Sequence, residues 1–90
     1  MAVTSVADTA TSTTLLAAAD AKSINGVSVF NDSSEILYLL QGIGTASTTS
    51  FSVKLAAGDY WESPDPMYVR GGLSGIWANN SSGAARITTW

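Results

Sequence analysis

The sequence predicts an all-β fold: a small antiparallel β-sandwich or barrel of about six or seven strands, with an extended N-terminal arm. Three observations support this prediction. Short apolar runs alternate with turn residues at intervals of about 8 to 12 residues, as in small all-β domains. No long segment repeats its apolar residues with the helical period. Ninety residues are enough for one domain with a modest core.

Residues 1–22 form the predicted arm, because Ser, Thr and Ala dominate there and bulky side chains are few. Such a composition buries too little apolar surface to fold alone. Within it, residues 11–16 (TSTTLL) have strand character and form the candidate edge strand, added to a sheet of the same domain or of a neighbouring subunit. We expect residues 1–10 to stay mobile or to reach a neighbouring protein. An alternative for the Ala-rich residues 15–22 is a short helix, although isolated helices need about 12 residues.

The predicted β-domain covers residues 23–90. Residues 24–30 (INGVSVF) alternate apolar and polar side chains, and the polar run NDSSE then ends the strand. Residues 36–40 (ILYLL) are apolar on both faces, which is typical of a central strand. Residues 51–55 (FSVKL) alternate again and predict a half-buried strand that turns through AAGD into YWE.

The last third of the chain predicts a crossing and a hairpin. Two prolines in residues 64–66 (PDP) indicate an irregular crossing rather than a strand interior. Residues 73–78 and 84–90 flank a polar turn, so the hairpin would return the C-terminal Trp90 into a sheet. The predicted core takes the inward residues of all these strands: Val27, Val29, Leu37, Leu39, Phe51, Val53, Leu55, Ile76 and Ile87. Trp77 lies between small residues and is expected to join this core.

Composition excludes several functions. The chain has no cysteine and no histidine, so it lacks disulfides, thiolate ligands and the usual general base near neutral pH. A net charge of −3 with scattered cations argues against binding to nucleic acid, and no apolar run reaches the length of a membrane span. The carboxylates Asp59, Glu62 and Asp65 lack the spacing of a calcium loop. We therefore predict no enzyme activity, no catalytic residues, no metal and no cofactor.

The candidate interface consists of aromatic, aliphatic and cationic side chains of the types that are common in subunit contacts. Trp90 has a second interpretation, as a lid on the edge of a small core. Trp61 is the better candidate for an exposed tryptophan, and with Tyr60 it could stack on a sugar. The residues proposed for contact with a partner are Leu15, Leu16, Trp61, Tyr68, Arg86 and Trp90.

Several motifs in chain order resemble a group of small proteins encoded among the virion genes of tailed bacteriophages and prophages. They are TSTTLLAA, NDSS, ILYL, GTAS, FSVKLAAGDYWESP and GGLSGIWANNSSGAARIT, and together they extend from about residue 11 to 89. The resemblance implies a virion component with an accessory structural role, such as a head decoration protein or a tail or fibre part. It carries no catalytic residues to transfer, and the PDP stretch is the least typical part.

Three functions are therefore carried forward. The first is a capsid decoration (cement) protein that binds and stabilises the shell of major capsid protein as a homo-oligomer, with a trimer favoured. The second is an adaptor in the tail, baseplate or fibre base, bound to another virion protein. The third is a carbohydrate-binding module. The N-terminus lacks the basic residues of a secretory signal, so we expect synthesis in the cytoplasm. The resemblance implies that this is the cytoplasm of a host bacterium and that the final place of the protein is the virion.

Overall fold

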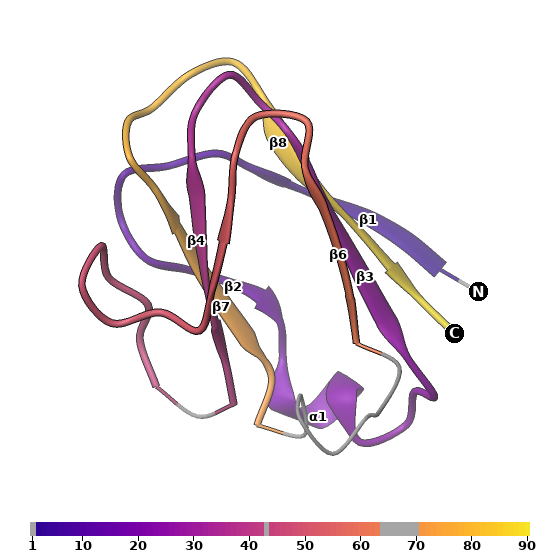
Figure 1. The fold of residues 1–90 in the computed structure, drawn as a ribbon. Coiled ribbons are helices and arrows are strands. Elements are labelled where there is room, and N and C mark those ends of the chain that lie inside the picture. The colour runs from indigo at the N-terminus through magenta and orange to yellow at the C-terminus, as the bar shows by residue number, and fades with distance from the viewer. Residues whose placement is uncertain (1, 43, 64–70) are drawn as a thin grey trace.

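Two four-stranded antiparallel sheets, packed face to face, make up the fold (Figure 1). The computed structural model describes residues 2–42, 44–63 and 71–90. The all-β prediction is confirmed, with eight strands in the described residues instead of six or seven. In chain order the elements are β1 (Ala2–Ala7), β2 (Thr13–Leu16), α1 (Ala18–Ala21), β3 (Val27–Asp32), β4 (Leu37–Gln41), β5 (Val53–Leu55), β6 (Tyr60–Ser63), β7 (Leu73–Trp77) and β8 (Ala84–Thr89).

The first sheet has the strand order β1-β8-β3-β6, and the second has the order β2-β7-β4-β5. Only β4 and β5 follow one another within the same sheet, so every other connection crosses from one sheet to the other. As a result β1 pairs with β8, from opposite ends of the sequence, with Ala2 opposite Thr89 and Ala7 opposite Ala84. The two chain ends consequently lie on the same side of the molecule (Figure 1).

The core lies between the sheets and follows the two-residue period of the strands. Val27 and Val29 of β3 face it from the first sheet, and Leu37 and Leu39 of β4 face it from the second. Trp77 is fully buried, as expected. The complete buried cluster contains Leu15, Leu16, Ala21, Val27, Val29, Leu37, Leu39, Leu55, Leu73, Trp77, Ala85 and Ile87.

Three predicted core residues differ from this arrangement. Val53 and Ile76 are only partly buried. Phe51 is 39% exposed, so the prediction that it belongs to the core was wrong. It precedes β5 and packs edge-to-face against Tyr38, with ring centroids 4.9 Å apart, on the outer side of the second sheet. The alternation of FSVKL suggested one strand, but pairing begins only at Val53.

The N-terminal residues belong to both sheets. β2 lies at the edge of the second sheet and pairs with β7 of its own chain. Residues 2–7, expected to be mobile, instead form β1, because all six pair with β8. α1 is a single helical turn, and it buries Ala21. No helix in the described residues is long and apolar enough to cross a membrane.

Candidate partner-binding surface

The outer face of the first sheet carries most of the large apolar side chains that the fold leaves in solvent. Inward residues of β3 are fully buried, so their neighbours Ser28, Phe30 and Asp32 point outward. The described chain has five exposed large hydrophobic residues, and four of them belong to this face by register: Val3 (65% exposed), Phe30 (39%), Tyr60 (57%) and Trp90 (38%). We call this surface the outer face.

Register places an aromatic pair at the centre of the outer face. Phe30 is directly opposite Tyr60 on β6 and directly opposite Arg86 on β8. Side chains opposite one another in antiparallel strands have Cβ atoms about 4.5–5.5 Å apart, so these three form one row across the sheet. Because β6 is an edge strand, Tyr60 is open to approach from the side as well as from above.

Polar groups surround the aromatic pair and are held in place. The Arg86 guanidinium donates to the Asp32 carboxylate at 3.0 Å and to the Ser5 hydroxyl at 3.0 Å. On the other side of the pair, the Tyr60 hydroxyl donates to the Glu62 carboxylate. This hydrogen bond raises the pKa of Tyr60 above its usual value.

Trp90 is anchored at one end of the outer face. Its backbone N–H donates to the Gly26 carbonyl at 3.1 Å, and the Gly26 N–H donates back to the Trp90 carbonyl at 3.1 Å. The indole lies over Gly26, where a Cβ atom would come within 2.5 Å of the ring. A side chain at position 26 would therefore displace the indole. Trp90 is held in a sheet, as predicted, but the predicted closing hairpin is wrong, because β7 and β8 belong to different sheets and β8 pairs with β1 and β3 instead.

The outer side of the second sheet is partly covered by a loop of the same chain. The segment after β4 passes over it and buries Ala46, whose N–H donates to the Ser74 hydroxyl at 3.0 Å. Ser52 then donates its N–H to the Leu39 carbonyl at 2.7 Å. This loop extends away from the second sheet in Figure 1. This side therefore presents the loop together with the Tyr38–Phe51 pair, whereas four of the five exposed large hydrophobic residues of the described chain lie on the outer face.

The six residues proposed for the interface divide into three groups. Leu15 and Leu16 are buried in the core of their own chain, and Trp61 points inward and packs against that core. Tyr68 lies outside the described residues. Arg86 and Trp90 both belong to the outer face, so the structure brings together only these two.

Sequence reasoning did not name Val3, Phe30 or Tyr60 among the interface residues, although it considered Tyr60, with Trp61, as a ring that could stack on a sugar. A signal for Phe30 existed, because it alternates with Val27 and Val29 and must face away from them. No comparable signal marked Val3, since residues 2–7 were not expected to form a strand. Tyr60 and Trp61 are neighbours on opposite faces of β6, and sequence alone does not tell which of them points outward.

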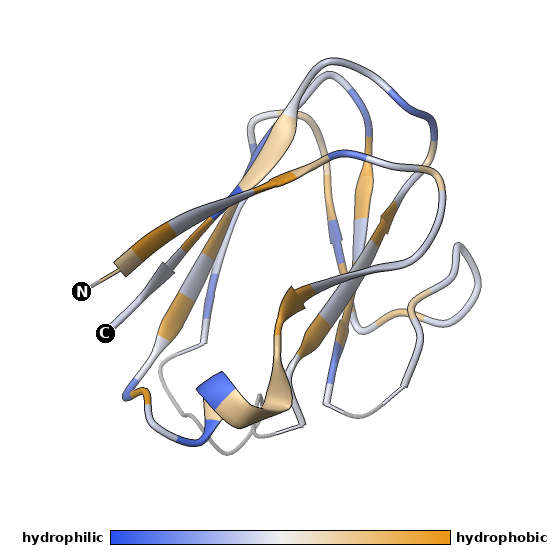
Figure 2. Ribbon diagram, turned by 180° about the vertical axis from the view of Figure 1, so that it is seen from behind, coloured by the Kyte–Doolittle hydropathy of each residue, from blue (hydrophilic) through white to orange (hydrophobic). Residues whose placement is uncertain are grey.

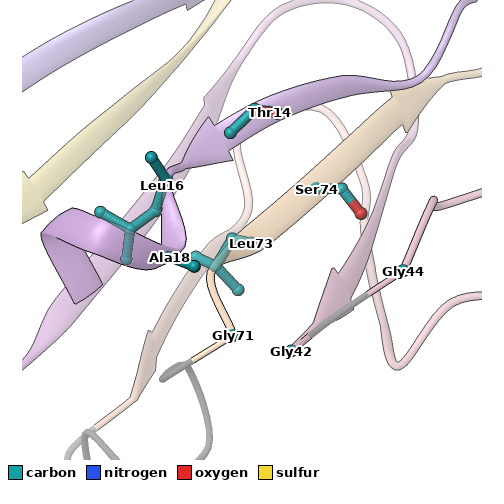
Figure 3. A pocket seen from close by; sticks show the side chains of 9 residues that line it. Thr14, Leu16, Ala18, Gly42, Gly44, Gly71, Leu73 and Ser74 are labelled. Atoms are coloured by element: carbon teal, nitrogen blue, oxygen red, sulfur yellow. The ribbon is translucent and has the colours of Figure 1, made fainter. Parts of the chain in front are cut away.

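Two hollows among the described residues are considered as possible sites. The first, of about 240 Å³, lies beside the start of α1 (Figure 3). Leu16 and Ala18 line it on one side and Gly42 and Gly44 on another, and none of the described residues that line it has an ionisable side chain. Its Ser74 hydroxyl already accepts a hydrogen bond from Ala46. The part of the chain described by the structure also contains no group of three His, Cys, Asp or Glu residues that could hold a metal ion.

The second hollow is larger and lies between the sheets, under β1. It measures about 420 Å³ and is lined mainly by aliphatic side chains, with Asp20 among the polar residues at its wall. β1 contributes only Ala2 and Thr4 to it, while β2 contributes Leu15 and Leu16. Because the inward residues of β1 are small, they leave this space unfilled. We call it the β1 hollow.

Comparisons of the chain with protein-family models, with curated proteins and with solved structures found no match.

Proposed function

We propose that this chain is a non-enzymatic structural protein of a tailed-bacteriophage particle, and that it decorates the capsid by binding the shell of major capsid protein. The observation that carries the proposal is the outer face, where one uncovered sheet surface holds Phe30, Tyr60 and Trp90 together with Arg86. Aromatic residues and arginine are the types that are enriched in protein interfaces. The resemblance of the sequence motifs to small virion proteins supports the same function.

Multiple copies on a particle also suit a domain of this size. A 90-residue chain without disulfides has a limited core. Contact with a shell and with neighbouring copies would bury further apolar area and stabilise the folded state by mass action. We propose that the chain associates with itself on the particle, with a trimer as the favoured state.

The test uses particles assembled without this protein and then mixed with purified variants. Phe30→Ser should raise the Kd for the particle at least tenfold, measured from bound copies over a range of protein concentrations, because a buried aromatic anchor contributes about 1.4 kcal/mol or more to binding. Phe51→Ser is the matched control, since Phe51 is equally exposed but lies on the other sheet. Equal binding by both variants would contradict the proposal.

Copy number separates this proposal from a role in the tail. Quantitative mass analysis of complete particles should give hundreds of copies for a shell protein. A few tens of copies or fewer would instead indicate an adaptor in the tail, baseplate or fibre base.

A second candidate function, carbohydrate binding, is favoured by the Phe30–Tyr60 pair. Two exposed aromatic rings side by side can stack on sugar faces, and Asp32 and Glu62 next to them can accept hydrogen bonds from sugar hydroxyls. Trp61, the ring first considered for this role, points into the core instead. Binding on a glycan array that Phe30→Ser abolishes and Phe51→Ser preserves would favour this second function, whereas no binding would remove it.

A further inference from the structure

The four edge strands of the two sheets differ in how they are protected against pairing with another chain. β2 contains a register shift between Thr14 and Leu16, β5 has three residues with Lys54 at its centre, and β6 carries Glu62. Bulges, short length and charges are the usual devices that prevent edge pairing. β1 has none of them. It has six uncharged residues, AVTSVA, in unbroken register with β8.

The backbone of β1 presents hydrogen-bonding groups along its outer edge. Asp8, which continues the register, donates its N–H to the Gly83 carbonyl at 3.1 Å. Antiparallel strands alternate between residues bonded to the neighbour and residues that point away. Thr4 and Val6 therefore bond to β8, while the N–H and C=O groups of Val3, Ser5 and Ala7 point to the edge. β1 has no second neighbouring strand in the part of the chain that the structure describes.

The β1 hollow lies beneath the same edge. Figure 2 shows β1, β2 and α1 together on the near side of the molecule seen from behind. A strand added to β1 would point every second side chain toward the space between the sheets, where Leu15, Leu16, Ile24 and Ile87 offer apolar contacts. An edge able to bond a strand and a space able to take its side chains thus occur at one place.

We propose that β1 and the β1 hollow form an acceptor site for one extended segment of a partner protein, which adds as a strand. The partner segment should have large aliphatic side chains at alternate positions, because these side chains would have to fill a hollow of about 420 Å³. A second copy of β1 would point only Ala2, Thr4 and Val6 inward, and these are too small to fill it. A basic residue beside the aliphatic run fits Asp20 at the wall of the hollow and the net charge of −3. This acceptor site goes beyond the proposed function, because it uses the open edge of β1, whereas the proposed function uses the outer face.

The experiment uses a fluorescently labelled peptide of alternating threonine and leucine with lysine at both ends, and measures binding by anisotropy. Ser5→Pro removes one edge N–H without touching the bonds to β8, and proline is tolerated at such positions. Ser5→Ala is its matched control, because both variants lose the hydroxyl that binds Arg86. We expect saturable binding to the wild-type chain and to Ser5→Ala, and at least tenfold weaker binding to Ser5→Pro.

A second variant and a second peptide test the hollow. Thr4→Leu leaves the edge amides in place but fills the space from within, so it should raise the melting temperature and weaken peptide binding. A peptide with alanine in place of leucine should bind at least tenfold more weakly than the leucine peptide. Both results stay informative if Ser5→Pro fails to fold.

Several outcomes would overturn the inference. These are no binding of the leucine peptide to the wild-type chain, equal binding to Ser5→Pro and Ser5→Ala, and equal binding of the two peptides. Dimerisation of the free chain that Ser5→Pro abolishes would also overturn it, since the occupant would then be a second copy. None of these measurements uses a phage particle, so their failure is distinguishable from failure of the proposed function.

Discussion

At the scale of single residues, Asn31 is the side chain with the most demanding environment. It is fully buried, and its amide nitrogen donates to the carbonyls of Glu35, Leu55 and Ala56 at 2.8–3.1 Å. Its amide oxygen accepts from the Trp77 indole at 3.1 Å and from the Ser33 hydroxyl at 2.9 Å. Removing the amide would take the acceptor away from the buried Trp77 indole N–H and a donor away from the Leu55 carbonyl. The carbonyls of Glu35 and Ala56 would keep other donors, the Ser33 hydroxyl and the Asp59 N–H.

We predict that Asn31→Leu lowers the free energy of unfolding by about 3 kcal/mol, because it leaves the buried Trp77 indole N–H without its acceptor and removes the buried bond to the Leu55 carbonyl. Urea denaturation followed by tryptophan fluorescence measures the change. Asp32→Ala, at the next position, is the control. It removes a half-exposed ion pair with Arg86 and should cost less than about 1 kcal/mol. Equal costs for the two variants would contradict this account of Asn31.

Asp8 makes stability depend on pH. Its carboxylate accepts from both the hydroxyl and the backbone N–H of Ser81, and these bonds hold the pKa of Asp8 below its ordinary value of 3.8. A group with a lowered pKa in the folded state contributes its stability above the unfolded pKa and loses it as the pH falls through the folded value.

The expected result for Asp8 is a difference in melting temperature between wild type and Asp8→Asn that depends on pH. Wild type should melt higher above a pH of about 5, and the difference should shrink steadily below 3.8 as the carboxylate takes up its proton. Thermal scans from neutral pH to about pH 3 measure it. A difference that stays constant over this range would mean that the charge on Asp8 contributes nothing.

At the scale of elements, β1 and β2 show how far sequence could predict the N-terminal region. Residues 13–16 end in two leucines, which are buried, so their strand was identifiable from β-propensity and apolar character. β1 is mostly exposed and owes its order to pairing with β8. Its partner is about 80 residues away in the chain, and single-sequence patterns carry no information on such pairing.

The register of β1 predicts that proline destabilises the fold by very different amounts at two adjacent positions. Thr4→Pro removes an N–H that bonds to β8 and should destabilise the fold by about 3 kcal/mol. Ser5→Pro removes an N–H at the open edge and should cost about 1 kcal/mol or less. Urea denaturation compares the two, and amide hydrogen exchange in the wild-type chain should be slower at Thr4 than at Ser5. The reverse order of stability would show that the assigned register is wrong.

At the scale of the whole molecule, the sequence predicted the fold class and most of the core, but it did not predict which residues form the outer face. Alternation in VSVF correctly separated the inward Val27 and Val29 from the outward Phe30 in β3, and Leu37 and Leu39 of the uniformly apolar ILYLL are buried as predicted. Asn31 was assigned to a turn because polar runs usually mark turns, yet it ends up buried through partners that come from distant parts of the chain. The outer face also depends on three-dimensional pairing, since Val3, Phe30 and Tyr60 come from β1, β3 and β6.

The hydrogen bonds of Asn31 also connect the two layers of the sandwich. Asn31 lies on β3 in the first sheet, whereas Trp77 and Leu55 lie on β7 and β5 in the second. Apolar contact between sheets has no directional preference and would allow one layer to slide or rotate over the other. Bonds with fixed geometry between the layers allow only one alignment, which sets the angle between the outer face and the opposite sheet. A successful replacement at position 31 would therefore require a compensating change at position 77, and the two positions should be varied as a pair in any redesign of this domain.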